Sequence, residues 1–281
     1  MQRLAIVTGL GIAAAIGVCA IVGCNSRTAA EATTQQPAKA AKKQAESERP
    51  DKSGNGMVAL GGAAQANKYL FALFWKEEND QTAAMRKALG TVMETAAERA
   101  DSVEVNVTDP SEKPIVDKFD LDRAPMPLIL AVAPNGAITG GFPTEVDAQS
   151  LMKAFATPCT AECMKFLQEN KLVFLCVQNA TTESNDAAME GVRQFKADAR
   201  FAQATEIVRL DPKDEAEAEF LADLQIDPGT GKAVTVFLAP PGAPIAMYEG
   251  ATNKDEFVAT LQKAGSCGPG GSCGPGGCAP K

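Results

Sequence analysis

Apolar and polar positions in residues 68–155 alternate between the two-residue period of strands and the 3.6-residue period of helices. Short apolar or alternating runs predict four strands, at 68–75, 102–107, 128–132 and 137–142. Apolar residues at every third or fourth position predict three helices, at 80–99, 112–119 and 144–155. Thr144 and Asp147 have the spacing of a capping box at the start of the last helix. The order is βαβα followed by ββα, which predicts a sheet covered by helices.

The same order of elements returns in the second half of the chain. Strands are predicted at 171–177, 204–210, 233–239 and 245–250, and helices at 186–199, 215–224 and 255–264. The run KLVFLCV at 171–177 matches KYLFALF at 68–74, an offset of 103 residues. The turn at 239–242 matches the turn at 133–136 at an offset of 106. A nearly constant offset predicts the duplication of one unit.

The order of elements resembles the thioredoxin fold. Met126-Pro127 stands directly before the third strand, where thioredoxin-like proteins carry a cis-proline. The Pro134-Asn135-Gly136 turn and the following strand with Gly140-Gly141 resemble the same family. The resemblance implies an α/β protein with two tandem thioredoxin-like domains, each a central mixed sheet flanked by helices. It also implies that Pro127 is the cis-proline, a substrate-binding feature of the family.

Residues 1–23 resemble the signal peptide of bacterial lipoproteins. Arg3 precedes the apolar run 4–20, and Ile21-Val22-Gly23-Cys24 resembles the lipobox. The resemblance implies that Cys24 is acylated, and that the chain is exported and lipid-anchored to a bacterial membrane, facing the periplasm or the cell surface. The alternative is an uncleaved anchor, because an apolar run of about 20 residues can span a bilayer. Both interpretations place the rest of the chain outside the cytoplasm.

The remaining boundaries follow from composition. Residues 24–66 are rich in Ala, Gln, Lys, Ser and Gly and have no apolar period, which predicts a disordered tether. The two thioredoxin-like domains are then expected at 67–157 and 158–265. Residues 266–281 form a Gly/Pro/Cys repeat that cannot pack a core, and are expected to be a flexible tail.

Charge and composition exclude several functions. The formal net charge is −8 and the chain has no dense block of Lys and Arg, which excludes nucleic acid as the partner. There is no histidine, so Ser–His and Cys–His nucleophiles and imidazole metal ligands are excluded as well. Any metal site would have to use thiolates or carboxylates.

The positions at which the thioredoxin family carries Cys-x-x-Cys hold no cysteine. In the first half Trp75 is followed by Lys76-Glu77-Glu78-Asn79, and in the second half residues 178–182 read QNATT. Ala233 stands at the second cis-proline position. The sequence therefore predicts that neither half performs conventional dithiol exchange, which favours a binding or scaffold protein with an envelope protein as partner.

The exported cysteines lie elsewhere. Cys159 and Cys163 are four residues apart on a predicted helix that begins at Pro158 with Thr157 as cap, so both thiols share one helical face. No such pair precedes residue 68, so the segment 158–170 is interpreted as an addition to the repeat. Cys176, inside a predicted buried strand, is expected to be a core residue. The tail adds Cys267, Cys273 and Cys278.

Cys159 and Cys163, in the hinge between the two predicted domains, and the three tail cysteines leave three hypotheses. In the first, they form structural disulfides that join the tail to the hinge, as an oxidising compartment favours. In the second, they form a soft-metal site for Cu(I) or Zn(II). In the third, they relay disulfides through the tail. The expected function is a membrane-anchored, catalytically degenerate thioredoxin-like binding or scaffold protein; the alternative is an envelope thiol–disulfide oxidoreductase that uses these cysteines.

Overall fold

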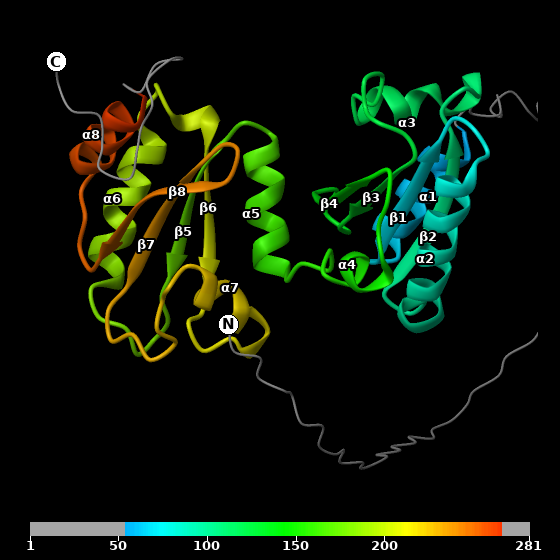
Figure 1. Ribbon diagram of the computed structural model, residues 1–281. Coiled ribbons are helices and arrows are strands. Elements are labelled where there is room, and N and C mark those ends of the chain that lie inside the picture. Colours follow the sequence, from blue (N-terminus) through cyan, green and yellow to red (C-terminus); the bar gives the residue numbers. More distant parts are fainter. Residues whose placement is uncertain (1–53, 266–281) are drawn as a thin grey trace, which may run out of the picture. The chain divides into compact units, whose positions relative to one another are not determined.

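A sheet with a buried central strand organises the first domain (Figure 1). Within residues 54–157 of the computed structural model, which describes residues 54–265, the strands are β1 (Tyr69–Trp75), β2 (Ala100–Asn106), β3 (Leu128–Val132) and β4 (Ile138–Pro143). Their order is β2-β1-β3-β4, with β1 parallel to β2 and antiparallel to β3. β1 is central because its side chains are apolar on both faces of the sheet.

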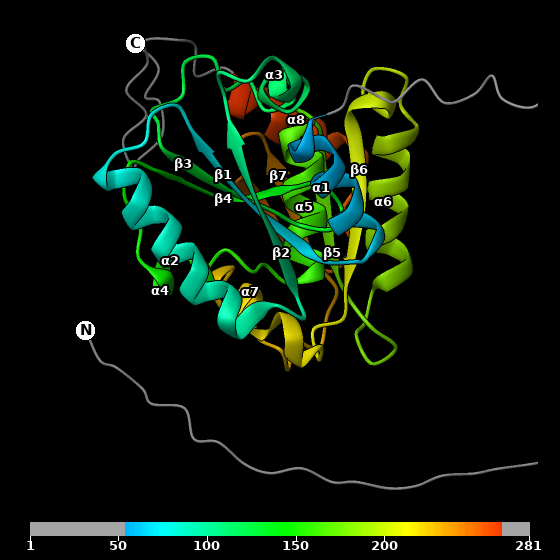
Figure 2. The same ribbon diagram turned by 90° about the vertical axis from the view of Figure 1, so that its right-hand side faces the viewer.

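Helices cover both faces of this sheet, as Figure 2 shows for α1 and α2. The helices are α1 (Asn55–Gln65), α2 (Asp80–Ala96), α3 (Lys113–Lys118), α4 (Ala148–Met152) and the 3₁₀ turn η1 (Pro110–Glu112). On one face, Leu70 and Phe74 of β1 pack in a core cluster with Ile115 of α3 and Ala63 of α1. On the other face, the core contains residues of β1, α2 and α4, including Phe71, Leu73, Met85, Leu89 and Leu151.

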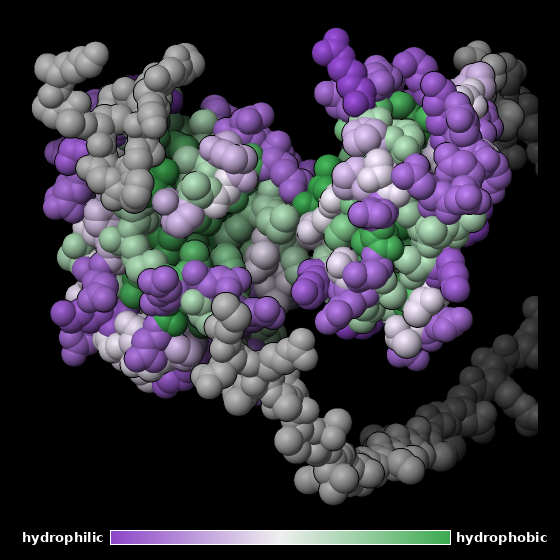
Figure 3. All heavy atoms as spheres, viewed as in Figure 1, coloured by the Kyte–Doolittle hydropathy of each residue, from purple (hydrophilic) through white to green (hydrophobic). Residues whose placement is uncertain are grey.

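The second domain repeats this plan. Its strands are β5 (Leu172–Val177), β6 (Thr205–Leu210), β7 (Val234–Ala239) and β8 (Ala243–Glu249), in the order β6-β5-β7-β8. Its helices and 3₁₀ turns are α5 (Pro158–Gln168), α6 (Asn185–Ala197), η2 (Ala202–Ala204), η3 (Glu215–Glu217), α7 (Ala218–Asp223) and α8 (Lys254–Gly265). One face of the sheet carries an aromatic core in which Phe174 stacks on Phe237 at 4.3 Å. In Figure 3, residues of intermediate to high hydropathy, coloured pale to green, gather over β7 and β8. Met247 of β8 is 45% exposed.

Each domain has a parallel pair of strands joined by a helix, then an antiparallel hairpin and a closing helix. This is the thioredoxin-like topology, so the predicted fold of two tandem thioredoxin-like domains is confirmed. Cys24 and the tail cysteines Cys267, Cys273 and Cys278 lie outside the described residues. Within residues 54–265, no helix combines the length and the hydrophobicity that a membrane crossing requires.

The expectation that the tether reaches residue 66 is wrong for residues 55–65, which form α1. The segment reads NGMVALGGAAQ and buries only Gly56 and Ala63, with Met57 and Leu60 half-buried against the core, so it lacks the regular stripe of large apolar residues that predicts a helix. Gly56 lies close to η1 and α3: an added Cβ there would stand 2.9 Å from Ile115 and from the Glu112 carboxylate. Close packing of α1 therefore needs a small residue at this point.

Helix α1 also corrects the interpretation of residues 158–170 as an addition to the repeat. α1 and α5 have the same length and precede β1 and β5 by the same number of residues. After the helices, Asn67 and Asn170 both adopt a left-handed conformation, with φ of 54° and 58°. A buried glutamate accepts a hydrogen bond from the first turn of each helix, Glu112 from Gly56 N and Glu217 from Cys159 N. The helix that carries the cysteine pair is thus the first helix of the duplicated unit.

The predicted helix 144–155 is much shorter, and Thr144 does not cap it. The helix α4 begins at Ala148, with Asp147 as its cap, because the Asp147 carboxylate accepts a hydrogen bond from Ser150 N at 2.7 Å. Thr144 has a φ of 65° and instead donates its backbone N–H to Pro127 O. This hydrogen bond ties the end of β4 to the residue that precedes β3.

Candidate functional site

A groove in the first domain lies where thioredoxin-like proteins have their site. On one side of it, the peptide bond between Met126 and Pro127 is cis, the conformation that the resemblance implies for Pro127. On the other side, residues 76–79 connect β1 to α2. The cavity between them has a volume of about 200 Å³ and is lined by Lys76, Glu77, Asn79, Thr82, Met126 and Pro127.

The loop of residues 76–79 is held firmly in place. The Asn79 side chain accepts a hydrogen bond from Thr82 N at 2.9 Å and caps α2. The buried Thr82 hydroxyl donates to Glu77 O at 2.9 Å. Glu78 forms an ion pair with Arg86 at 2.7 Å. The loop is therefore pre-organised by contacts within the first domain.

Among residues 54–265, no cysteine lines the groove. Lys76 and Asn79 have the spacing of the two cysteines in Cys-x-x-Cys, and they line the cavity opposite Pro127. Neither an amine nor an amide exchanges disulfides. The described lining of the groove therefore supplies no thiol for thiol–disulfide exchange.

The backbone of Met126 is open in this groove. Among residues 54–265, neither its N–H nor its C=O forms a hydrogen bond. Met126 is half-buried and directly precedes β3. Its peptide groups are therefore in place to pair with an extended segment from another molecule.

The corresponding place in the second domain is closed. Lys232 corresponds to Met126, and the Thr230 hydroxyl bonds both its N–H, at 3.4 Å, and its C=O, at 2.9 Å. On either side of Lys232, Glu183 N donates to Gly231 O and Ala233 N donates to Glu183 O. The second domain thus satisfies with its own chain the backbone groups that the first domain leaves open.

Two substitutions between the repeats explain much of this difference. Ala233 corresponds to Pro127 and donates its N–H to Glu183 at 2.9 Å. Proline has no N–H, so the loop of the first domain cannot form the equivalent hydrogen bond. Ala124, which corresponds to Thr230, has no hydroxyl group. Pro127 therefore keeps the first groove open.

Cys159 and Cys163 lie in the core of the second domain. They are 8% and 3% exposed and pack with residues of β5, β6 and β7, including Val173, Leu175 and Val236. The neighbouring Cys163 thiol, burial and the carboxylate of Glu217 raise the pKa of the Cys159 thiol far above its ordinary value. Thr157 is the N-cap residue of α5, as expected, but its hydroxyl contacts Glu217 and Thr160 rather than the backbone of the helix.

The other candidate thiols are separate from this pair. Cys176 is buried in β5, in the core on the opposite face of the sheet, and burial raises its pKa to about 12. Of the five cysteines expected to form one site, the structure describes only Cys159 and Cys163, which it brings together. In residues 54–265, no group of three or more Cys, Asp or Glu side chains is arranged to hold a metal ion.

Thiol labelling tests this placement. With a pKa of about 12, roughly one Cys176 thiol in 10,000 is ionised at pH 8, and only the thiolate reacts. After reduction, we expect Cys159, Cys163 and Cys176 to remain unmodified by N-ethylmaleimide in the folded chain at pH 8. All three should react in concentrated guanidinium chloride. Peptide mass spectrometry locates the label, and rapid labelling of any of the three before unfolding would contradict their burial.

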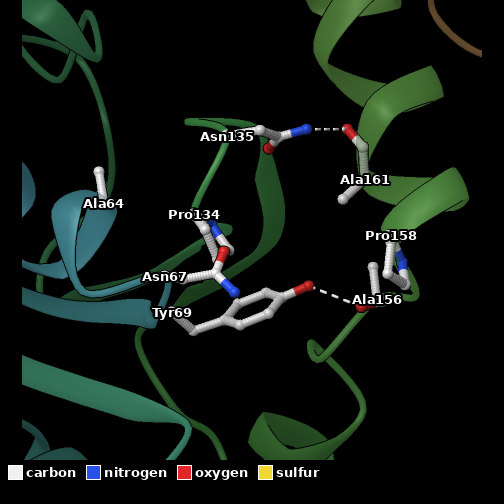
Figure 4. Close-up of a pocket in the computed structure, with 8 residues that line it drawn as sticks. All are labelled: Ala64, Asn67, Tyr69, Pro134, Asn135, Ala156, Pro158 and Ala161. Carbon is white, nitrogen blue, oxygen red and sulfur yellow. Dashed lines mark hydrogen bonds between the residues drawn. The ribbon is translucent and has the colours of Figure 1, made fainter. Parts of the chain in front are cut away.

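A second cavity, of about 420 Å³, adjoins the start of α5 (Figure 4). Two of its polar side chains are engaged: Tyr69 donates its hydroxyl to Ala156 O at 2.7 Å, and Asn135 donates its amide to Ala161 O at 2.9 Å. Gln168 bonds both the N–H and the C=O of Ile138 at the other end of α5. These contacts hold α5 against the hairpin of the first domain, so the cavity borders a structural contact.

Comparison with known proteins yields structural similarity only. No protein-family model matches the chain, and no curated protein is similar to it in sequence. The first two thioredoxin domains of Saccharomyces cerevisiae Eps1p are 8% identical, with 77% of this chain and 99% of that chain covered and a TM-score of 0.28. The NTD N/C domain of alkylhydroperoxide reductase AhpF from Enterococcus faecalis is 16% identical, with 72% of this chain and 95% of that chain covered and a TM-score of 0.24. Human ERp44 is 10% identical, with 73% of this chain and 55% of that chain covered and a TM-score of 0.31. The fold assignment rests on the strand order described above.

Sequence reasoning missed Met126 and Thr230 as determinants of the two grooves. Pro127 pointed to the first groove, and Ala233 was recognised as a lost proline. Because of that loss, Ala233 N can donate a backbone hydrogen bond to Glu183 O, 50 residues earlier in the sequence. No local sequence pattern predicts this hydrogen bond. Alignment of the two repeats around residues 124–127 and 230–233 is the signal that could have found it.

Proposed function

We propose that the chain is a thioredoxin-fold binding protein whose first domain holds an extended segment of a partner protein beside Pro127. One observation carries the proposal: the open backbone of Met126 in a groove whose lining, among residues 54–265, includes no cysteine. An extended segment placed there would pair with Met126 as an added strand, a common mode of peptide recognition. The family resemblance supports this, since the cis-proline is a substrate-binding feature there.

The second domain has a structural role in this proposal. Thr230 and Glu183 already occupy the backbone groups around Lys232, so no extended segment can pair there without displacing them. α5 of this domain contacts the hairpin of the first domain through Asn135 and Ile138. The second domain would therefore act as a scaffold for the binding domain.

The insulin reduction assay separates this function from the alternative, an envelope oxidoreductase that uses Cys159, Cys163 and the tail cysteines. Cys159 and Cys163 are buried, and buried thiols are poor nucleophiles, so the chain is expected not to accelerate the reduction of insulin by dithiothreitol. The turbidity of precipitating B chain gives the rate. A rate that rises with the concentration of the chain, and falls when the tail cysteines are replaced by serine, would support the oxidoreductase.

We further propose that the protein is exported and anchored to a bacterial membrane through acylated Cys24. The motif Ile21-Val22-Gly23-Cys24 after an apolar run supports this. The Cys24→Ser variant is expected to leave the membrane fraction, or to accumulate with its signal peptide uncleaved. Fractionation followed by mass spectrometry of the N-terminal peptide reports both outcomes. An unchanged membrane fraction with an unmodified Cys24 in the wild type would contradict acylation.

The hinge and tail cysteines complete the proposal. They would form disulfides or bind a soft metal, while the groove binds the partner. The burial of Cys159 and Cys163 favours uses that need no reactive thiolate in the resting protein. Mass spectrometry of the intact protein, with and without reductant, counts disulfides and bound metal together.

A further inference from the structure

Two thiols stand together beside a cavity of the second domain. Cys159 and Cys163 are one turn apart on α5, on the same helical face, and the Cys163 thiol is close enough to raise the pKa of Cys159. Cys163 lines a cavity of about 270 Å³ whose walls are mainly apolar. The walls include Met164, Leu167, Phe220, Leu224 and Leu238. A small species that enters this cavity therefore reaches the Cys163 thiol.

The fold does not require sulfur at these two positions. In the first domain, the residues equivalent to Cys159 and Cys163 are Gly56 and Leu60. Leu60 packs against the core cluster of its domain, as Cys163 does in the second. The repeat thus folds with no thiol in its first helix.

The chemistry of the pair favours a soft, monovalent cation. Structural zinc is held by four ligands, and residues 54–265 provide no group of three or more Cys, Asp or Glu for one ion. The nearby Glu217 carboxylate already accepts hydrogen bonds from Cys159 N and from the Thr157 hydroxyl. Thiolate and thioether sulfur selects Cu(I), and two thiolates suffice for that ion.

We propose that Cys159 and Cys163 bind one Cu(I) ion as a two-thiolate site entered through this cavity. The proposal rests on the soft-metal use of the cysteines proposed above and narrows it to two residues, without the tail. It is independent of the groove in the first domain, so the failure of either leaves the other standing.

Binding is balanced by proton release. Each thiol gives up its proton as its sulfur bonds to Cu(I), so one ion displaces two protons and no electron is transferred. Because two protons leave as one ion binds, affinity should rise by up to about 100-fold for each unit of pH while the free thiols are protonated. This pH dependence distinguishes the pair from a surface site with one thiol, where the rise would be about tenfold.

The test is an anaerobic titration of the full chain with Cu(I), with bathocuproine disulfonate as competitor. Every protein in it carries serine at Cys267, Cys273 and Cys278, so that the tail adds no thiol. The parent is compared with Cys163→Leu, which installs the residue of the first repeat, and with Cys159→Ala. Cys176→Ala is the matched control, because it removes a buried thiol outside the pair. Far-UV circular dichroism and the thermal midpoint show which variants are folded.

The parent and Cys176→Ala are expected to bind one more tight Cu(I) per chain than Cys163→Leu and Cys159→Ala. The affinity lost should exceed about 100-fold, the upper limit for changes that only reposition a ligand. Equal binding by the parent and the two folded pair variants would overturn the proposal. So would a parent whose affinity changes about tenfold per pH unit, or a parent that binds no Cu(I).

Discussion

Cysteines introduced at positions 76 and 79 are expected to convert the first domain into a disulfide reductase. The Lys76→Cys/Asn79→Cys double variant should accelerate insulin reduction by dithiothreitol, whereas the wild-type chain should not. A thiol at a helix N-terminus can have its pKa lowered from about 8.5 to about 7, which raises its thiolate fraction at pH 7 more than tenfold. The expected rate is therefore at least about tenfold above that of an ordinary thiol at the same concentration, whereas the wild-type chain should leave the uncatalysed rate unchanged.

The rest of the groove is already suited to this chemistry. Both positions face the cavity that Pro127 and Met126 line, and α2 begins directly after Asn79. Arg86 pairs with Glu78 and offsets the charge of one of the two glutamates that would otherwise oppose a thiolate. The loss of the Asn79 cap should cost about 1 kcal/mol, which a folded domain tolerates.

The second domain provides the matched control. Thr181 and Ser184 correspond to Lys76 and Asn79, counted from the starts of α6 and α2. The Thr181→Cys/Ser184→Cys variant is expected to remain inactive, because Thr230 and Glu183 occupy the backbone on which a substrate would lie. Equal activity of the two double variants would contradict the difference between an open and a closed groove. Inactivity of both would contradict the pre-organised first groove.

Glu217→Ala is expected to destabilise the second domain by about 2–4 kcal/mol, since buried hydrogen bonds to a charged group contribute about 1.5–3 kcal/mol each. Glu217 is 2% exposed and accepts hydrogen bonds from Cys159 N and the Thr157 hydroxyl. Alanine would leave Cys159 N without this partner at the start of α5, while the Thr157 hydroxyl would keep its contact with Thr160. Glu215→Ala, an exposed position in the same 3₁₀ turn, should change stability by less than about 0.5 kcal/mol.

The repeat allows each domain to be monitored separately. Trp75 is the only tryptophan in the sequence and lies in β1, so its fluorescence reports on the first domain. In urea, Glu217→Ala should shift the transition measured by circular dichroism and leave the fluorescence transition in place. Glu112→Ala should shift the fluorescence transition instead, because Glu112 accepts from Gly56 N in the first domain. A variant of Glu217 as stable as that of Glu215 would show that the buried carboxylate does not hold α5.

The strands and their order could be predicted from the sequence because buried strands have an unmistakable pattern. KYLFALFW and KLVFLCV are apolar on both faces, and their spacing revealed the duplication. α1 could not be predicted, since its packing against Glu112 and Ile115 requires glycine where an amphipathic helix shows large apolar residues. Without α1, the segment that forms α5 has no counterpart in the first half, so the sequence alone suggests an addition to the repeat.

The candidate site could be predicted in its chemistry but not in its geometry. The absence of Cys-x-x-Cys and the presence of Pro127 are visible in the sequence. The buried glutamates Glu112 and Glu217 are not, because polar segments give no sign that a carboxylate will accept hydrogen bonds from a helix. Likewise, only the fold brings Glu183 to Ala233.

The open groove of the first domain is tested most directly by residue-resolved amide hydrogen exchange. The full chain is compared with and without reduced, carboxymethylated α-lactalbumin, an unfolded probe with blocked thiols. The Met126 amide should exchange freely in the chain alone and slow at least about tenfold with the probe, whereas the Ala233 amide should be protected in both. A Met126 amide that is protected without the probe, or that does not slow when the probe is present, would contradict the proposed binding groove.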